Sequence, residues 1–384
     1  MVTGAYFPEL SGAGLQCREL VRQLRDVVGF TVLTTTTDPS LPARDERDGV
    51  PVHRVFVDTR SAWSKLTAGL RMMRVVFGER GRFSIVHLHG FSQKSMLLVV
   101  LALMTGKRLA IKLTSVGHDD PAAILARGAL AYWCYSRARI FFGVSPRLEA
   151  LYQASGLPSG RFRLIPNGVD LQRFQPASPD DRRALRAGLG LPADGPLILF
   201  VGFFSREKCP DLLFDAWSRL ASHADRSSVL VFVGATRSSY YEVDDRLAAG
   251  IRERAARLGL EARLHFVEAT LEIEKYQRAA DIFVLPSVRE GLPNALLEAM
   301  ACGVACVATR LPGVTDSLID DRESGILVPP RDTAALEAAL AHLVSQPDRA
   351  RAMGVRARQR IERDFSLAQT ARQYLAAYQD MLAS

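Results

Sequence analysis

The sequence predicts an α/β protein built from two doubly wound domains in series, and three observations lead to this prediction. With 384 residues, the chain is long enough for two domains of about 190 residues each. Short apolar runs alternate with amphipathic segments of helical period from end to end. Apolar residues make up 48% of the chain and charged residues 23%, which supplies a core for each half and excludes long disorder.

The first half of the chain has the pattern of alternating strands and helices around a parallel sheet. Only residues 1–3 precede the first glycine-containing loop, so either the first strand is short at a central position or the numbered start is internal to a longer gene product. His87 and His89 lie in the strand predicted at 84–89, and they are expected to point to its opposite faces. Strands are predicted at 31–35, 52–57, 84–89, 109–115, 139–144 and 162–166, and helices at 15–28, 63–77 and 121–136.

The second half repeats the alternation after a stretch rich in Pro, Gly, Asp and Arg at 166–195, which places the domain boundary near residue 170. Strands are predicted at 197–201, 229–233, 263–267, 281–285, 304–308 and 325–328, and helices at 210–220, about 241–258, 271–279, 294–302, 332–345 and 348–363.

Composition limits the classes of function and the compartment. The 49 basic and 41 acidic residues give a net charge of +8, which suits a protein that meets phosphates, and no arginine block of nucleic-acid type is present. The five cysteines are scattered without a C-x-x-C pair, which argues against a disulfide framework or a zinc site. There is no leader pattern, and the longest strongly apolar stretch, 96–104, is too short to span a bilayer. The protein is therefore expected in the cytoplasm, at most bound to the inner face of the cell membrane.

The strongest local signal is the segment 286–313, in which a strand ends, a loop follows and Asn294 opens a helix. The N–H groups and the dipole at such a helix start favour an anion, so a diphosphate is expected against Asn294 and Ala295. Glu290 lies in the loop, where it can reach a hydroxylated substrate. Glu298, after seven intervening residues, can accept hydrogen bonds from a ribose diol. The alternative for this pair is an acid at a helix start and a solvated helix residue.

These motifs together resemble glycosyltransferase family 4. The resemblance covers essentially the whole chain and rests on YFPELSGAGLQ near the start, IVHLHG, TSVGHDD, IPNGVD, LFVGFFSREK and the E-x7-E element that ends at Glu298. It implies the GT-B fold, two facing Rossmann-like doubly wound domains with an interdomain cleft. The expected domains are an acceptor-binding one at 1–170, a nucleotide-sugar-binding one at 171–364, and a C-terminal helix at 365–384 that returns to the first.

The resemblance also implies an activity: retaining transfer of a sugar from a nucleotide-sugar to an acceptor hydroxyl, with no metal and no other cofactor. The absence of a D-x-D sequence agrees with a metal-free donor site. Front-face displacement is the implied mechanism, with a covalent intermediate on a carboxylate as the alternative. Glu290 would contact the sugar and Glu298 the ribose. The other donor-binding residues would be Gly291, Leu292, Pro293, Asn294 and Ala295, together with Gly12 and Gly14 of the first domain.

Lys208 is the expected cation for the leaving diphosphate, because it matches the lysine of the family pattern G-R-x-x-x-x-K-G. The sequence departs from that pattern at two positions, where Phe203 replaces the arginine and Cys209 replaces the second glycine. Arg206 either supplies the missing charge or is simply solvated on the loop.

In the first domain, Gly12 and Gly14 stand where the family carries its glycine pair and would let a phosphate or sugar approach the backbone. As a dinucleotide fingerprint this G-x-G is weak. His118 resembles the family histidine near the reacting centre, and would donate a hydrogen bond to the sugar or shape the acceptor side. The alternative is a loop histidine bonded to Asp119 or Asp120.

Partners and competing functions remain open at this level. The acceptor can be a carbohydrate, a lipid-linked group or a small molecule, as in polysaccharide, glycolipid or glycoconjugate biosynthesis, and no nucleic acid is expected. The segment 60–82 has the spacing of a basic amphipathic helix, which either contacts a membrane surface or packs on its own sheet. A nucleotide-sugar epimerase of the same architecture and a non-catalytic nucleotide-sugar binder are the alternative functions.

Overall fold

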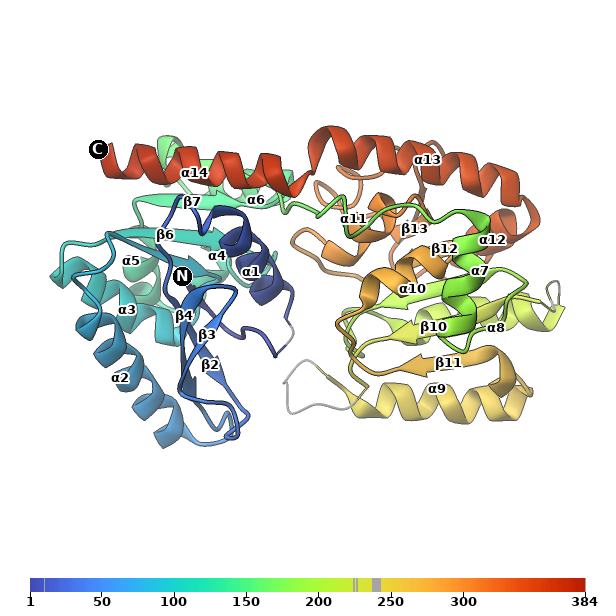
Figure 1. The fold of residues 1–384 in the computed structure, drawn as a ribbon, viewed down its shortest axis with the longest axis horizontal. Helices are drawn as coiled ribbons and strands as arrows, with labels where there is room; N and C mark the ends of the chain where they lie inside the picture. Colours follow the sequence, from blue (N-terminus) through green and yellow to red (C-terminus); the bar gives the residue numbers. More distant parts are fainter. Residues whose placement is uncertain (10, 224, 226, 237–242, 384) are drawn as a thin grey trace. The chain divides into compact units, whose positions relative to one another are not determined.

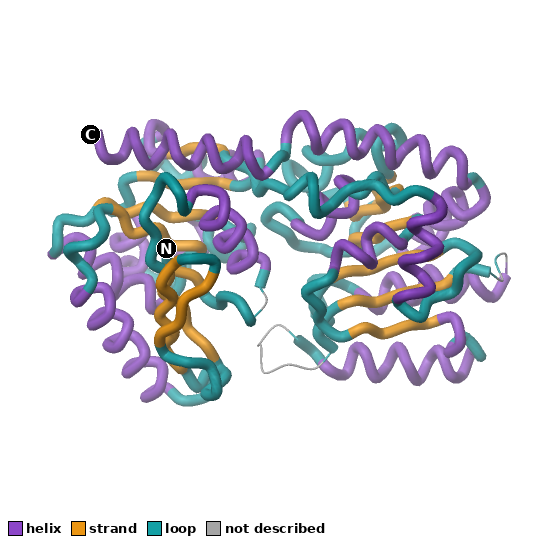
Figure 2. Tube along the Cα trace, in the orientation of Figure 1, coloured by secondary structure: helices purple, strands orange, loops and turns teal. Residues whose placement is uncertain are grey.

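The computed structural model describes residues 1–9, 11–223, 225, 227–236 and 243–383, and the chain forms two compact units. Unit 1 consists of Met1–Gly168 with Leu367–Ser384, and unit 2 of Val169–Ser366 (Figure 1). In each unit the strands lie side by side and are flanked by helices (Figure 2). None of the helices in the described part of the chain has both the length and the apolar character that a membrane-spanning helix needs.

The sheet of unit 1 has eight strands in the order β3-β4-β2-β1-β5-β6-β7-β8. All neighbouring strands are parallel except β3 and β4, which are antiparallel. The two-residue strand β1 lies between β2 and β5, so the centre of the sheet is short. The strands are β1 (Val2–Thr3), β2 (Val32–Thr36), β3 (Arg44–Arg47), β4 (Val50–Phe56), β5 (Ile85–His89), β6 (Arg108–Leu113), β7 (Ile140–Gly143) and β8 (Phe162–Leu164).

Helices cover this sheet, and the last of them comes from the end of the chain. Tyr374, Tyr378 and Met381 of that last helix pack in one apolar cluster with Leu20 and Phe142. The helices of unit 1 are α1 (Gly12–Leu24), α2 (Ala62–Gly78), α3 (Gln93–Met104), α4 (Pro121–Leu125), α5 (Ala129–Ser136), α6 (Pro146–Gln153) and α14 (Leu367–Ala383).

The sheet of unit 2 has six parallel strands in the order β11-β10-β9-β12-β13-β14. Apolar side chains such as Phe200, Trp217 and Phe232 form its buried core. The strands are β9 (Leu197–Val201), β10 (Val229–Val233), β11 (Leu264–Val267), β12 (Ile282–Leu285), β13 (Ala305–Thr309) and β14 (Ile326–Val328). The helices are α7 (Pro179–Gly188), α8 (Pro210–His223), α9 (Asp245–Leu258), α10 (Ile273–Ala279), α11 (Asn294–Ala301), α12 (Thr333–Ser345) and α13 (Pro347–Asp364).

The structure corrects the expected secondary structure in several places. The expected helix at 121–136 is two helices, because Gly128 has φ of 113°, which no helix interior allows. Helix α7 lies inside the stretch that composition assigned to a linker, where Ser178 caps it and Pro179 begins it. The edge strand β3, α3 and α6 were not expected. Residues 241–242 of the expected helix 241–258 lie outside the described residues.

The expectation for His87 and His89 was wrong. Their ring centroids lie 4.5 Å apart, and both side chains are buried. Residues two apart on a strand share a face, because side chains alternate with a period of two. His87 Nδ1 lies 2.7 Å from the Tyr378 hydroxyl, and burial holds the pKa of both imidazoles well below the usual value.

Candidate active site

The strand order of unit 2 marks one place where a ligand would bind. The chain adds strands outward from β9 on one side and then returns to add β12 on the other, so the order reverses between these two strands. In open parallel sheets, ligands bind at the carboxyl ends of the two strands that flank such a reversal. The two loops that leave this point are 202–209 after β9 and 286–293 after β12.

These loops bring together the two charged residues predicted at the centre of the site. Lys208 Nζ donates to Glu290 Oε1 at 2.6 Å. The carboxylate side chain is 8% exposed and the lysine side chain 26% exposed, so the acid lies deeper than the cation. A buried carboxylate is stabilised when an ammonium group pairs with it. The ammonium remains reachable for an anion at the same edge of the sheet.

Helix α11 supplies the second element of the site. It begins at Asn294, and the preceding residue, Pro293, makes no side-chain capping bond to its N–H groups. The segment before it, 291–293, is buried, whereas Asn294 and Ala295 are half-buried. Gln277 Nε2 donates to the Ala295 carbonyl at 3.2 Å. Glu298 follows in the second turn and is half-buried.

Arg206 lies on the same loop as Lys208, but its side chain is directed elsewhere. Its side chain is 79% exposed, and Nε lies 3.5 Å from Asp244 Oδ2 at the start of α9. Arg246 pairs with the same carboxylate at 2.9 Å. These hydrogen bonds lower the pKa of Asp244 to about 2, and the bond from Arg246 has the largest effect. The charge of Arg206 therefore faces an aspartate.

Cys209 is the departure from the family pattern in which a residue with a side chain replaces glycine. Its φ is 48°, in the left-handed region that favours glycine, and it occupies the position where the pattern carries glycine. The thiol is buried and donates to the Arg206 carbonyl at 3.1 Å. Burial raises the pKa of this thiol to about 11. The loop keeps the left-handed turn although the residue has a side chain.

In unit 1 the corresponding reversal lies between β1 and β5, and Gly12 and Gly14 sit in the first turn of α1 just after the β1 loop. Ser11 Oγ caps this helix by accepting from Gly14 N–H at 3.0 Å. A Cβ atom on Gly14 would lie 2.3 Å from the Ala5 carbonyl oxygen. This glycine is therefore required for the loop to pack against the helix start.

His118 lies in the loop that follows β6 and is half-buried. Its carbonyl accepts from Arg127 Nη2 at 2.6 Å. The neighbouring aspartates hold the loop: Asp119 accepts from the N–H of Phe91 at 3.0 Å, and Asp120 caps α4 through Ala123 N–H at 3.0 Å. These bonds hold the His118 loop close to the residues that follow β5.

Sequence reasoning did not single out Lys94 or Glu9, which lie at the carboxyl edge of the unit 1 sheet. Lys94 Nζ donates to Thr35 Oγ1 at 2.7 Å, and Glu9 Oε1 accepts from Thr37 N–H at 3.2 Å. Burial lowers the pKa of Lys94 to about 8, against an opposing effect of Glu9. The signal that could have found Lys94 is its rarity, because the chain holds only six lysines.

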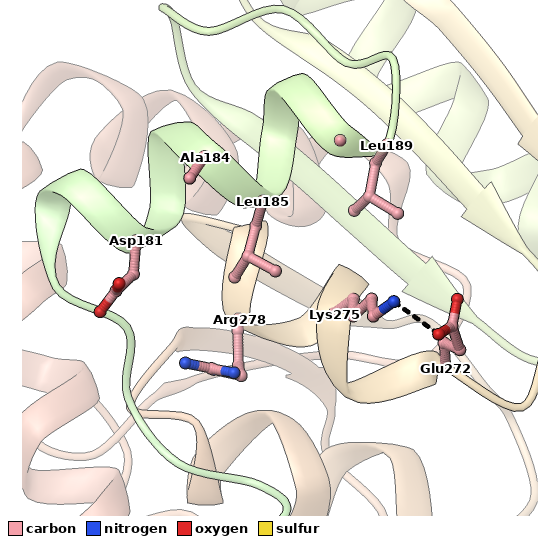
Figure 3. Close-up of a pocket in the computed structure, with 8 residues that line it drawn as sticks. Asp181, Ala184, Leu185, Leu189, Glu272, Lys275 and Arg278 are labelled. Atoms are coloured by element: carbon pink, nitrogen blue, oxygen red, sulfur yellow. Dashed lines mark hydrogen bonds and ion pairs between the residues drawn. The ribbon is translucent and has the colours of Figure 1, made fainter.

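A surface groove of about 400 Å³ lies elsewhere on unit 2, between α7 and α10. Figure 3 shows Asp181, Ala184 and Leu185 of α7 on one side, with Lys275 and Arg278 of α10 on the other. Lys275 pairs with Glu272 at 2.5 Å. None of the residues predicted for the site lines this groove.

All five cysteines are free and buried. Within the described ranges, no group of three or more His, Cys, Asp or Glu side chains is arranged to hold a metal ion.

Two family models match the chain, one in each half. Residues 181–360 match the family described as Glycosyl transferases group 1, and residues 11–168 match the Glycosyl transferase 4-like domain. Among curated proteins, a D-inositol 3-phosphate glycosyltransferase from Catenulispora acidiphila is 29% identical over 98% of this chain and 92% of its own length. An alpha-maltose-1-phosphate synthase from Mycolicibacterium smegmatis is 29% identical over 100% of this chain and 99% of its own.

Solved structures share the fold. Sucrose-phosphate synthase from Thermosynechococcus elongatus aligns with a TM-score of 0.82 at 23% identity, covering 100% of this chain and 98% of that one. HepE from Anabaena, solved in complex with UDP and glucose, aligns with a TM-score of 0.79 at 17% identity, covering 98% of each chain. At these identities the similarity establishes the fold, which is GT-B as expected.

Proposed function

The chain belongs to glycosyltransferase family 4 and is a glycosyltransferase, and on this premise we propose that it moves a sugar from a nucleotide-sugar to an acceptor hydroxyl with retention of configuration and without a metal. The observation that carries the proposal is the Lys208–Glu290 pair at the reversal point of the unit 2 sheet. Family resemblance and strand order thus point to the same two residues.

Each proposed role follows from the chemistry of the group. Lys208 and the N–H groups at the start of α11 stabilise the negative charge that develops on the leaving diphosphate, and each well-placed donor contributes about 3 kcal/mol. Glu290 accepts hydrogen bonds from sugar hydroxyls and orients the ring. Glu298 accepts from the ribose diol. The departing phosphate oxygen takes the acceptor proton. Arg206 has a smaller share, because its side chain is exposed and pairs with Asp244.

Unit 1 is proposed to hold the acceptor, with His118 on the acceptor side. Gly12, which is exposed in the first turn of α1, would leave the backbone open to approach, whereas Gly14 is buried and packs against the Ala5 carbonyl. Relatives are named for D-inositol 3-phosphate and for maltose 1-phosphate, so phosphorylated polyols and sugars are the first acceptors to test. The biosynthesis of a polysaccharide, glycolipid or glycoconjugate would use such a transfer.

Helix α2 supports a peripheral membrane contact as part of this proposal. One side of the helix is buried through Ala68, Met72 and Val76. Its exposed side carries the large apolar side chains of Trp63, Leu66, Leu70 and Phe77. Basic residues on the same helix would favour an anionic surface. Sedimentation with anionic vesicles at low salt tests this contact, and a protein that stays in the supernatant contradicts it.

A thermal-shift panel of nucleotides and nucleotide-sugars tests the donor site. UDP and UDP-glucose lead the panel, because HepE structures contain UDP and UDP-glucose. Glu298→Ala is expected to abolish most of the shift seen with the best ligand. Glu337→Ala, which removes a half-buried acid of α12, is the matched control. An unchanged shift in Glu298→Ala contradicts the ribose contact.

Incubation with the donor alone tests the alternative function. If the sugar of the donor is epimerised, the protein is an epimerase and not a transferase.

A further inference from the structure

Three successive contacts join the loops that follow β9 and β12. The N–H of Val288 donates to the Glu207 carbonyl at 2.8 Å. The Arg289 guanidinium then bonds the Glu207 carboxylate along one edge, with Nε at 3.0 Å from Oε2 and Nη2 in contact with Oε1. One residue further on each loop, Lys208 pairs with Glu290.

The two ion pairs differ in depth. The Glu207 and Arg289 side chains are 45% and 31% exposed, whereas the Lys208 and Glu290 side chains are 26% and 8% exposed. We therefore call Glu207–Arg289 the outer pair and Lys208–Glu290 the inner pair. The outer pair uses residues for which neither the family pattern nor the proposed mechanism has a role.

We propose that the outer pair Glu207–Arg289 is a positioning pair, which keeps Lys208 and Glu290 in register while the donor diphosphate binds Lys208. This inference rests on the proposed function. An anion that binds the Lys208 ammonium competes with Glu290 for it, so the inner pair weakens when the donor arrives. Two contacts that do not involve the ligand then hold the loops together: the Val288–Glu207 backbone bond, and the outer pair, which alone acts through side chains.

The chemistry of arginine suits this task. Its planar fork meets a carboxylate through two parallel hydrogen bonds and so fixes direction as well as distance, whereas a lysine offers a point charge. Exposed ion pairs contribute little to folding stability, at most about 1 kcal/mol. A displacement of about 1 Å in a catalytic group costs on the order of 100-fold in rate. Loss of the outer pair should therefore lower turnover far more than stability.

The test uses the full chain with UDP-glucose as donor and compares Arg289→Gln, Glu207→Gln and the double variant. Each single variant is expected to lower kcat by 10- to 100-fold with less than a threefold change in donor KM. The double variant should be no worse than either single one, because both remove the same link. Arg289→Lys should recover part of kcat, since it keeps the charge but loses the fork.

Arg173→Ala is the matched control. Arg173 pairs with another glutamate of unit 2, with Nε and Nη2 at 3.0 and 2.7 Å from the same oxygen, Glu274 Oε2, and the two side chains are 33% and 20% exposed. Its kcat should stay within twofold of the wild type. Thermal unfolding of every variant separates loss of turnover from loss of fold.

Three outcomes overturn the inference. If the wild type turns over UDP-glucose and Arg289→Gln keeps kcat within twofold, or if the two single losses multiply in the double variant, the outer pair does not position the site. If the wild type binds none of the nucleotides and nucleotide-sugars of the thermal-shift panel, the proposed donor chemistry fails and the inference fails with it.

Discussion

The ammonium of Lys208 lies 2.6 Å from the carboxylate of Glu290, although 82 positions separate the two residues in the chain. The strand order causes this meeting, because β9 and β12 are neighbours and their loops leave the same edge of the sheet. The cation proposed for the leaving group and the acid proposed for the sugar thus meet at one edge of the unit 2 sheet.

Lys208→Met should lower kcat by at least about 100-fold, because it removes a donor from the developing charge of the diphosphate. Glu290→Gln should also lower kcat, because the neutral amide keeps only one acceptor oxygen for the sugar hydroxyls and removes the carboxylate that pairs with Lys208. Steady-state kinetics with UDP-glucose measures both effects, with Arg173→Ala as the control. A Lys208→Met enzyme within threefold of the wild type would remove the lysine from the mechanism.

Cys209→Gly should be more stable than Cys209→Ala by about 1 kcal/mol, the reverse of the usual order in regular structure. The φ of 48° strains any residue with a Cβ, whereas glycine adopts it freely. Chemical denaturation of the two variants gives the difference directly, and both lack the thiol, so its burial cancels. Equal stability would mean that the loop relaxes out of the left-handed conformation.

Lys112→Met should show how a buried lysine changes the dependence of the free energy of unfolding on pH. Lys112 is buried beside Asn167 Oδ1 at 2.9 Å, and burial lowers its pKa to about 8. Between about pH 8 and 10.5, the folded side chain is neutral while the unfolded one still holds its proton. The unfolded state then binds more protons, so the free energy of unfolding contributed by this group rises with pH.

The comparison between wild type and Lys112→Met isolates this effect, since the other groups titrate in both proteins. The wild type should gain on the order of 3 kcal/mol relative to the variant across this window. Urea denaturation at several pH values measures the gain, with Lys65→Met as the control for removing a lysine from an exposed position of α2. A difference that stays flat or falls with pH contradicts the lowered pKa.

Much of the fold follows from local patterns. The strands at 197–201 and 229–233 begin and end where the apolar runs do, and Glu290 and Glu298 lie on a loop and a helix as the segment 286–313 indicates. Such features depend on periodicity and on helix starts, which are written into a few neighbouring residues. Helix α7 was missed because its charged residues resemble a linker, although Ser178 and Pro179 mark its start.

Other features depend on which distant residues meet. The charge of Arg206 could be predicted from the sequence, but its partner Asp244 could not, since many carboxylates compete for one arginine and only packing selects between them. The same holds for the Lys208–Glu290 and Glu207–Arg289 pairs, which exist because the order of strands reverses beside β9. The sequence alone determined the family, the alternation of strands and helices, and the residue types of the site. Tertiary structure decided their pairing, because strand order is set by burial across the whole sheet and not by any short segment.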